Sequence, residues 1–222
     1  MLQDLDEISD GKIYGPNDMV RVACHDCAGC SSCCRGMGDS ILLDPYDVWR
    51  LTTGTGQSFE QQLGHTIEAG VTKGLILPHL KMTGSRECCA YLDENGRCSI
   101  HALRPGLCRI FPLGRIYEPH SIRYFLQKDA CRITDRTKIK LIKWLDTPEW
   151  KKNEQFLLTW HAFRQSVEQY LTQVLQTEDA SAARTVNLFV LNLFFMQPYE
   201  SDDFYTQFAR RMSTAADAIK QR

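Results

Sequence analysis

The sequence lacks several features that would assign it directly to a common class. No stretch approaches the ~20 apolar residues of a membrane-spanning helix, and Asn192 interrupts the longest apolar run, residues 188–196. The charges nearly cancel, with 26 Lys and Arg against 27 Asp and Glu, which disfavours a general nucleic-acid binder. The opening residues, MLQDLDEISD, have neither the basic start nor the apolar run of a signal peptide. We therefore expect a cytoplasmic protein with neither a membrane nor a nucleic acid as partner.

Common catalytic motifs are also missing. The sequence contains no His-Glu-x-x-His motif, no nucleophile elbow and no Gly-rich turn between a strand and a helix. The cysteine triplet of radical S-adenosylmethionine enzymes is absent, because the gaps between the clustered cysteines are two, two, two and zero residues. The sequence therefore identifies no catalytic residue.

Cysteine is concentrated in one part of the chain. All ten cysteines lie between Cys24 and Cys131, and most of the eight prolines and fourteen glycines lie in the same part. From Thr134 onward the sequence has a helical pattern. This shift predicts a cysteine-rich metal- or cluster-binding domain over residues 1–133 and a helical bundle over residues 134–222.

Apolar spacing predicts four helices in the second part. The first covers residues 135–145, and the second follows Pro148 and reaches Leu175. The third covers residues 180–196 and is apolar nearly all round, which predicts a place in the middle of the bundle. The last covers residues 201–219.

Local signals predict small elements in the first part. Asp44 and Pro45 are suited to start a helix that stops near Gly54. Ser58 and Gln61 form a capping box that predicts a helix over residues 58–67. The Asn95-Gly96 turn predicts a hairpin with Cys89 and Cys98 on its two paired strands. A further strand is expected over residues 122–127. The expected fold is mainly α with small β-hairpin elements, in which an irregular, metal-nucleated cysteine-rich part packs on a C-terminal helical bundle.

The densest cysteine segment is CHDCAGCSSCC, residues 24–34. Disulfides, a redox thiol pair, a zinc site and an iron–sulfur cluster are the alternatives. A reducing compartment disfavours disulfides. Consecutive two-residue gaps are typical of iron–sulfur ligation, whereas zinc sites more often take a second pair from a distant segment. Because neighbouring side chains diverge, the pairs Cys33-Cys34 and Cys88-Cys89 indicate a second centre or a bridge between two metals.

Several motifs together carry a resemblance to a known family. Cys27-x-x-Cys30-x-x-Cys33-Cys34 resembles the signature of the YkgJ-type cysteine-cluster family, which is described as zinc- or iron-chelating. The segments Cys89-Ala-Tyr-Leu, Cys98-Ser-Ile-His and Arg104-Pro-x-x-Cys108-Arg109-x-Phe-Pro resemble its later elements, and Cys131 matches its final cysteine. The resemblance covers about residues 24–134. This sequence departs from the pattern by adding Cys24 and Cys88 and by having His101 in place of a tyrosine.

The resemblance implies a set of metal ligands, but the sequence does not divide them between centres. The matched residues are Cys27, Cys30, Cys33, Cys34, Cys89, Cys98, Cys108 and Cys131, and the additional candidates are Cys24 and Cys88. A centre with four thiolates carries negative charge, which is costly to bury without compensation. Arg104 and Arg109 flank Cys108, and we expect them to bind and tune the cofactor.

The expected function is metal binding through cysteine thiolates. The favoured cofactor is an iron–sulfur cluster of the 4Fe–4S kind, with a redox, metal-handling or cluster-dependent role. One alternative is a structural zinc site whose helical half binds a protein partner. The other follows from the resemblance, because flagellin lysine methylases share the cysteine motif, and it is methyl transfer to a protein lysine.

Overall fold

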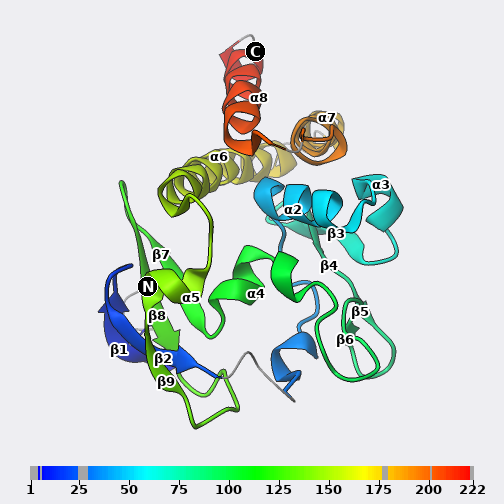
Figure 1. Cartoon of the computed structure of the whole chain (residues 1–222). Coiled ribbons are helices and arrows are strands. Elements are labelled where there is room, and N and C mark those ends of the chain that lie inside the picture. Colours follow the sequence, from blue (N-terminus) through cyan, green and yellow to red (C-terminus); the bar gives the residue numbers. More distant parts are fainter. Residues whose placement is uncertain (1–4, 6, 25–29, 177–179, 201, 221–222) are drawn as a thin grey trace. The chain divides into compact units, whose positions relative to one another are not determined.

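The computed structural model describes residue 5 and residues 7–24, 30–176, 180–200 and 202–220 (Figure 1). Contacts divide the chain into two compact units, each made of two separate segments. Unit 1 consists of residues 1–37 and 82–159, and unit 2 of residues 38–81 and 160–222. The predicted boundary after residue 133 concerns separately folding domains and stays a prediction.

The two units differ completely in cysteine content. All ten cysteines fall in the two segments of unit 1, and both segments of unit 2 contain none. The cysteine-free stretch 38–81 thus separates the first cysteine segment of unit 1 from the second.

Unit 1 is built from short antiparallel strands and short helices (Figure 1). Its three-stranded sheet has the order β1-β8-β7, and two-stranded pairs are formed by β2 with β9 and by β5 with β6. The strands are β1 (Ser9–Tyr14), β2 (Met19–Ala23), β5 (Met82–Thr83), β6 (Cys88–Cys89), β7 (Leu113–Tyr117), β8 (Ile122–Gln127) and β9 (Thr137–Lys140). The helices are η2 (Ser32–Cys34), η3 (His101–Leu103), α4 (Gly106–Ile110), α5 (Leu141–Leu145) and the first part of α6 (Trp150–Gln176). The expected strand over residues 122–127 is thereby confirmed.

The expected helix over residues 135–145 is only half right. Residues Thr137–Lys140 form strand β9, and the helix begins at Leu141. Thr137-Lys-Ile-Lys alternates polar and apolar residues, and pairing with β2 brings Ile139 opposite the buried Val20. The pairing partner, which is distant in sequence, therefore overrides the helical spacing.

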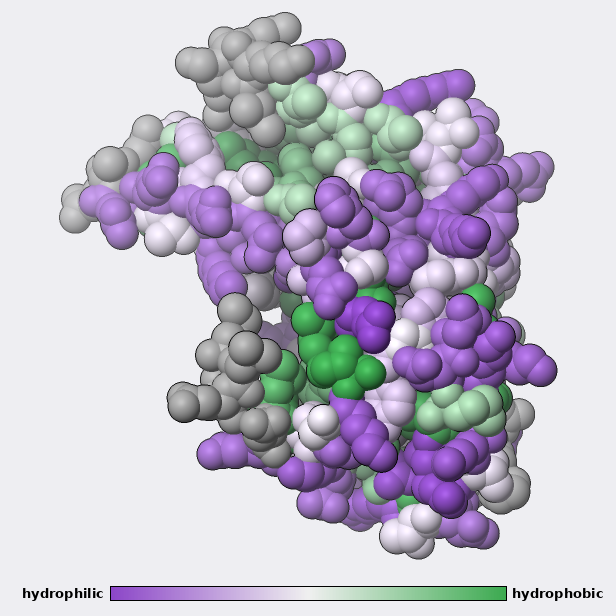
Figure 2. Space-filling model, turned by 90° about the vertical axis from the view of Figure 1, so that its left-hand side faces the viewer, coloured by the Kyte–Doolittle hydropathy of each residue, from purple (hydrophilic) through white to green (hydrophobic). Residues whose placement is uncertain are grey.

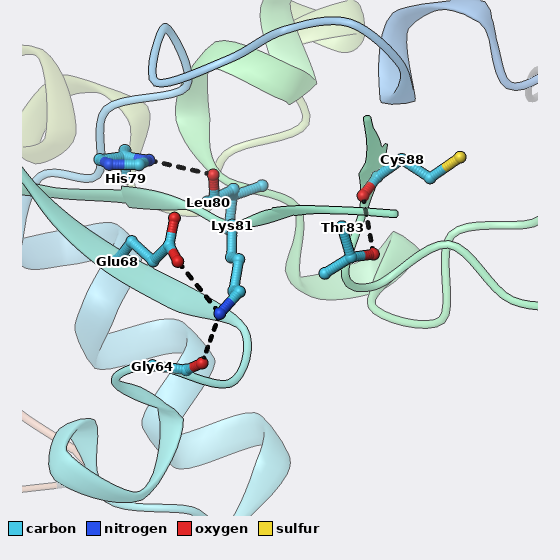
Figure 3. Close-up of polar contacts among 7 residues, drawn as sticks. All are labelled: Gly64, Glu68, His79, Leu80, Lys81, Thr83 and Cys88. Carbon is cyan, nitrogen blue, oxygen red and sulfur yellow. Dashed lines mark hydrogen bonds and ion pairs between the residues drawn. The ribbon is translucent and has the colours of Figure 1, made fainter. Parts of the chain in front are cut away.

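Unit 2 combines a β-hairpin with helices. Strands β3 (Ile67–Thr72) and β4 (Leu75–Leu80) form the hairpin. The helices are α2 (Pro45–Thr55), α3 (Phe59–Gln62), the second part of α6, α7 (Ala180–Leu191), the π-helical turn η4 (Asn192–Met196) and α8 (Phe204–Lys220). Near the hairpin, Lys81 pairs with Glu68 at 3.0 Å and donates to the carbonyl of Gly64 at 2.7 Å (Figure 3).

The predicted caps in unit 2 are confirmed, and two other predictions are corrected. Asp44 caps α2 reciprocally with Asp47, and Ser58 and Gln61 form the expected capping box. Helix α3 nevertheless ends at Gln62, because the residues from Ile67 on pair with β4. Helix α7 buries only one face, since Leu188 is 55% exposed.

The core of unit 2 is aromatic. Trp160 contacts Phe163, Phe194, Phe195 and Phe208 with ring centroids 5.1–6.4 Å apart. A second group joins α2 to α8, where Tyr46 meets Phe204 edge-on at 5.1 Å. The cysteine-free stretch 38–81 therefore shares its core with the C-terminal helices.

The surface is mixed. Figure 2 shows one face, on which hydrophobic residues gather in small groups among predominantly hydrophilic ones. Among the described residues, no helix combines the length and apolar character needed to cross a membrane.

Gly114 on β7 is required by an aromatic ring on the neighbouring strand. It pairs with Phe125 of β8, and a Cβ at position 114 would collide with the Phe125 ring. Because Phe125 is itself 9% exposed, the ring has little space into which it can move.

We predict that Gly114→Ala destabilises unit 1 by about 1–3 kcal/mol, the usual cost of overpacking a core. Chemical denaturation measures this loss. Gly84→Ala is not a suitable control because Gly84 has a positive φ, whereas His120→Ala changes an exposed residue of the same unit. Equal stability of Gly114→Ala and wild type would contradict the packing assigned to this strand pair.

Candidate metal centre

Four cysteines line one small cavity in unit 1. The cavity has a volume of about 20 Å³, and its thiols are Cys24, Cys30, Cys33 and Cys131. Cys24 directly follows β2, Cys33 belongs to η2, and Cys131 follows β8. A space of this size accommodates a water-sized occupant. Both segments of unit 1 therefore present sulfur to a common cavity.

The rest of the cavity wall is largely apolar. Phe111, Pro112, Ala130 and Ile133 line it, together with Ser32 and Arg132. Ser32 lies 3.6 Å from the Cys30 sulfur, within hydrogen-bond distance. The thiols thus stand in a largely apolar surrounding.

A second group of thiols adjoins the first. A hydrogen bond with Cys34 is the main factor that raises the pKa of Cys33, and burial adds to it. Burial raises the pKa of Cys89 and of Cys98, and the charge interactions of Cys89 with Cys98 and of both with Cys33 act in the same direction. Since such interactions weaken with distance, Cys33, Cys34, Cys89 and Cys98 form a neighbouring group, and Cys33 belongs to both groups.

Raised pKa values have a direct chemical meaning for these thiols. At neutral pH and without a metal, Cys33, Cys89 and Cys98 are protonated. Metal binding requires the thiolate form and releases the protons. Within the described ranges, no three His, Cys, Asp or Glu side chains are arranged to hold one metal ion, so the structure groups the thiols without converging them on one point.

Arg104 lies beside both thiol groups. Its positive charge lowers the pKa of Cys33 and Cys98, against the stronger effects that raise them. Its Nε donates to the carbonyl of His101 at 3.1 Å. Arg104 was predicted from the sequence as a cofactor-binding residue. Its position is suited to offset the negative charge of thiolates.

Arg109 is 6% exposed and bonds to the backbone. Its guanidinium donates to the carbonyls of Asp146 at 2.6 Å and Arg104 at 2.9 Å. In this structure Arg109 therefore ties α4 to the segment after α5 and holds the backbone of Arg104. Its expected role as a cofactor-binding residue stays a prediction.

Arg35 was missed by the sequence reasoning. Its Nη1 donates to the Cys88 sulfur at 2.6 Å, and its backbone forms an antiparallel bridge with Cys88. Its Nε donates to Ser31 at 3.2 Å. Thr83 donates to the Cys88 carbonyl at 3.2 Å (Figure 3). Arg35 thus joins the first cysteine segment to the second, and its place directly after Cys34 was the only signal in the sequence.

The turn expected at Asn95-Gly96 is present, but Cys89 does not lie on the strand predicted to pair with that of Cys98. Cys98 bridges Leu92, and Ser99 bonds to Tyr91, whereas Cys89 pairs with Met82 on β5. Cys89 and Cys98 therefore do not lie on the two paired strands of one hairpin. The side chain of Asp93 accepts from the backbone of Asn95 and Arg97 and tightens the loop, which starts the pairing closer to the turn.

The two further candidate ligands are Cys108 and Cys27. Cys108 is half-buried on α4, between the two arginines in sequence. Cys27 lies outside the described residues. The roles of both as ligands stay predictions.

Comparison with family models identifies the motif. A model described as "CxxCxxCC: Putative zinc- or iron-chelating domain" matches residues 26–148, more than half of the chain. The chain belongs to the CxxCxxCC family. The matched CxxCxxCC region covers nine of the ten cysteines, all except Cys24. Neither the curated proteins nor the solved structures gave a match, so the relation to flagellin lysine methylases stays an implication of the motif.

We predict that Arg35→Ala destabilises unit 1 by about 1–3 kcal/mol, because it removes the donor to the Cys88 sulfur and leaves only the backbone bridge between the two cysteine segments. Thermal and chemical denaturation measure the loss. Arg97→Ala serves as the control, since Arg97 is exposed and its removal should change stability by less than about 0.5 kcal/mol. If both variants unfold alike, the Arg35–Cys88 contact does not join the segments.

Proposed function

We propose that this protein holds an iron–sulfur centre through cysteine thiolates and serves in electron transfer, redox sensing or metal handling. The observation that carries the proposal is the cavity lined by Cys24, Cys30, Cys33 and Cys131. Thiolate is the ligand that zinc and iron–sulfur clusters share, so the donor set fits the family description of zinc or iron chelation. A reducing compartment, such as the cytoplasm, keeps these thiols available.

The number of thiols favours more than one metal atom. The two groups together contain seven different cysteines, namely Cys24, Cys30, Cys33, Cys34, Cys89, Cys98 and Cys131. A structural zinc ion takes four ligands. Seven grouped thiols therefore support either a polynuclear cluster with additional ligands or two centres that meet at Cys33.

Spacing favours iron–sulfur ligation over zinc. Cys24, Cys27, Cys30 and Cys33 follow one another with two-residue gaps, which is the pattern of cluster-binding loops. When bound, such a cluster supplies one-electron chemistry. The protein contributes the thiolates, the apolar wall of Phe111 and Ile133, and the positive charge of Arg104, and these are the factors that tune the potential.

A structural role for the same metal follows from the fold. Unit 1 consists of short strands and helices, and its two cysteine segments meet around the thiols. Metal binding by groups that are separated in the unfolded chain contributes directly to folding free energy. The metal is therefore proposed to nucleate unit 1 as well as to serve its chemistry.

The first test is the metal content of protein purified without oxygen. We expect iron with acid-labile sulfide and a brown colour, from thiolate-to-iron charge transfer. Cys30→Ser should lose metal and lower the melting temperature of unit 1, whereas Ser32→Ala, which changes a cavity residue without a thiol, should keep both. Zinc alone in a colourless protein would replace the iron–sulfur proposal by a structural zinc site. Full retention of metal in Cys30→Ser would contradict the assigned cavity.

Division of the thiols is tested by comparing three variants. Cys131→Ser should remove metal from the cavity group, Cys98→Ser from the second group, and Cys33→Ser from both. Metal-to-protein ratios of the purified variants measure this directly. If Cys131→Ser and Cys98→Ser each lose all metal, a single centre replaces the two adjoining ones.

A further inference from the structure

One surface of unit 1 is a short cationic ribbon formed by β2 and β9. Val20 and Val22 of β2 are 1% and 0% exposed and face the interior. The alternate residues face outward and pair across the ribbon, Met19 with Lys140 and Arg21 with Lys138. The outer face therefore carries three cations around one exposed methionine.

The charges of this ribbon repel one another. Arg21 stands directly opposite Lys138, and like charges in this arrangement destabilise a strand pair. Residues 128–143 contain six Lys or Arg against two Asp, although the whole chain has a net charge of -1. Among the residues that the structure describes, no acidic side chain forms an ion pair with Arg21, Lys138 or Lys140.

Arg136, next to the ribbon, has two hydrogen-bond donors without a partner among the described atoms. Its carbonyl accepts a 3.0 Å hydrogen bond from Arg21. Its own Nε and Nη1 are shielded from solvent and have no hydrogen-bond partner among the described atoms. Shielded, unpaired donors are costly, and Arg136 adds a further positive charge next to the ribbon. An incoming carboxylate would relieve the repulsion between the cations of the ribbon.

The ribbon leads directly to the thiol cavity. Cys24 follows the last residue of β2, and Cys131 and Arg132 of the cavity wall precede β9 by a few residues. A partner bound on the ribbon would thus lie beside the cavity. This juxtaposition matters for any centre that exchanges electrons or metal with another protein.

The exposed apolar residue points to a protein partner. Met19 is 53% exposed in the middle of the cations, and interfaces between proteins are enriched in Met and Arg. A nucleic-acid surface is expected instead to be a broad basic face on a basic domain. We propose that the β2–β9 ribbon docks an acidic segment of a protein that exchanges electrons or metal with the thiol centre, an inference that rests on the proposed function for the identity of the exchange.

The test uses the full-length protein and a short fluorescent peptide in which Glu and Ala alternate. We expect binding that weakens as salt is added, since charges of this kind are screened over about 10 Å at 0.1 M. The double variant R21E/K138E should weaken binding about tenfold or more. The control K151E/R184E changes the net charge equally at exposed sites outside the ribbon and should stay within about twofold of wild type.

Cross-linking locates the contact. A carbodiimide should join the peptide carboxylates to Lys138 or Lys140, as mapped by mass spectrometry. Cross-links at Lys151, equal binding by R21E/K138E and wild type, or binding of a duplex oligonucleotide in preference to the peptide would each overturn the proposal. Metal is quantified in the same preparations. Binding without metal overturns the proposed function alone, whereas metal without binding overturns the ribbon alone.

Discussion

The cysteine-rich unit depends on the Arg35–Cys88 contact, which holds together two segments that are far apart in the sequence. Its first segment ends at residue 37, and its second begins at residue 82, after a cysteine-free stretch that shares a core with the C-terminal helices. The backbone bridge between Arg35 and Cys88, with the guanidinium donating to sulfur, joins the two segments. Cys33 and Cys34 are thereby brought near Cys89, and no thiol group that spans both segments forms unless the two segments meet.

Local chemistry was predictable from the sequence, and long-range pairing was not. The caps at Asp44 and Ser58 depend on side chains three residues apart, which a sequence displays directly. Strand β9 and the end of α3 depend on partners far along the chain, so helical spacing misassigned them. The absence of cysteine from residues 38–81 was visible, but only the structure shows that this stretch packs with the distant helices.

In the candidate site, too, the local motif was predictable from the sequence and the long-range arrangement was not. The motif and its family were readable because the cysteine spacing is specific. The distribution of the thiols around a cavity and a second group, with Cys33 common to both, arises from tertiary contacts. Arg35 escaped notice because an arginine beside a cysteine pair has no sequence signature, whereas Arg104 was found from the charge that thiolates require.

Electrostatics connects the site to its surroundings. Burial and repulsion between thiolates raise the pKa of Cys89 and Cys98 and favour their protonated forms until a metal replaces the protons. Arg104 offsets part of the negative charge that then develops. X-ray absorption at the iron and zinc edges, on protein purified without oxygen, tests this account most directly. The account predicts iron bound by sulfur with a second metal atom close by. A zinc ion with only sulfur neighbours, at about 2.3 Å, would contradict it.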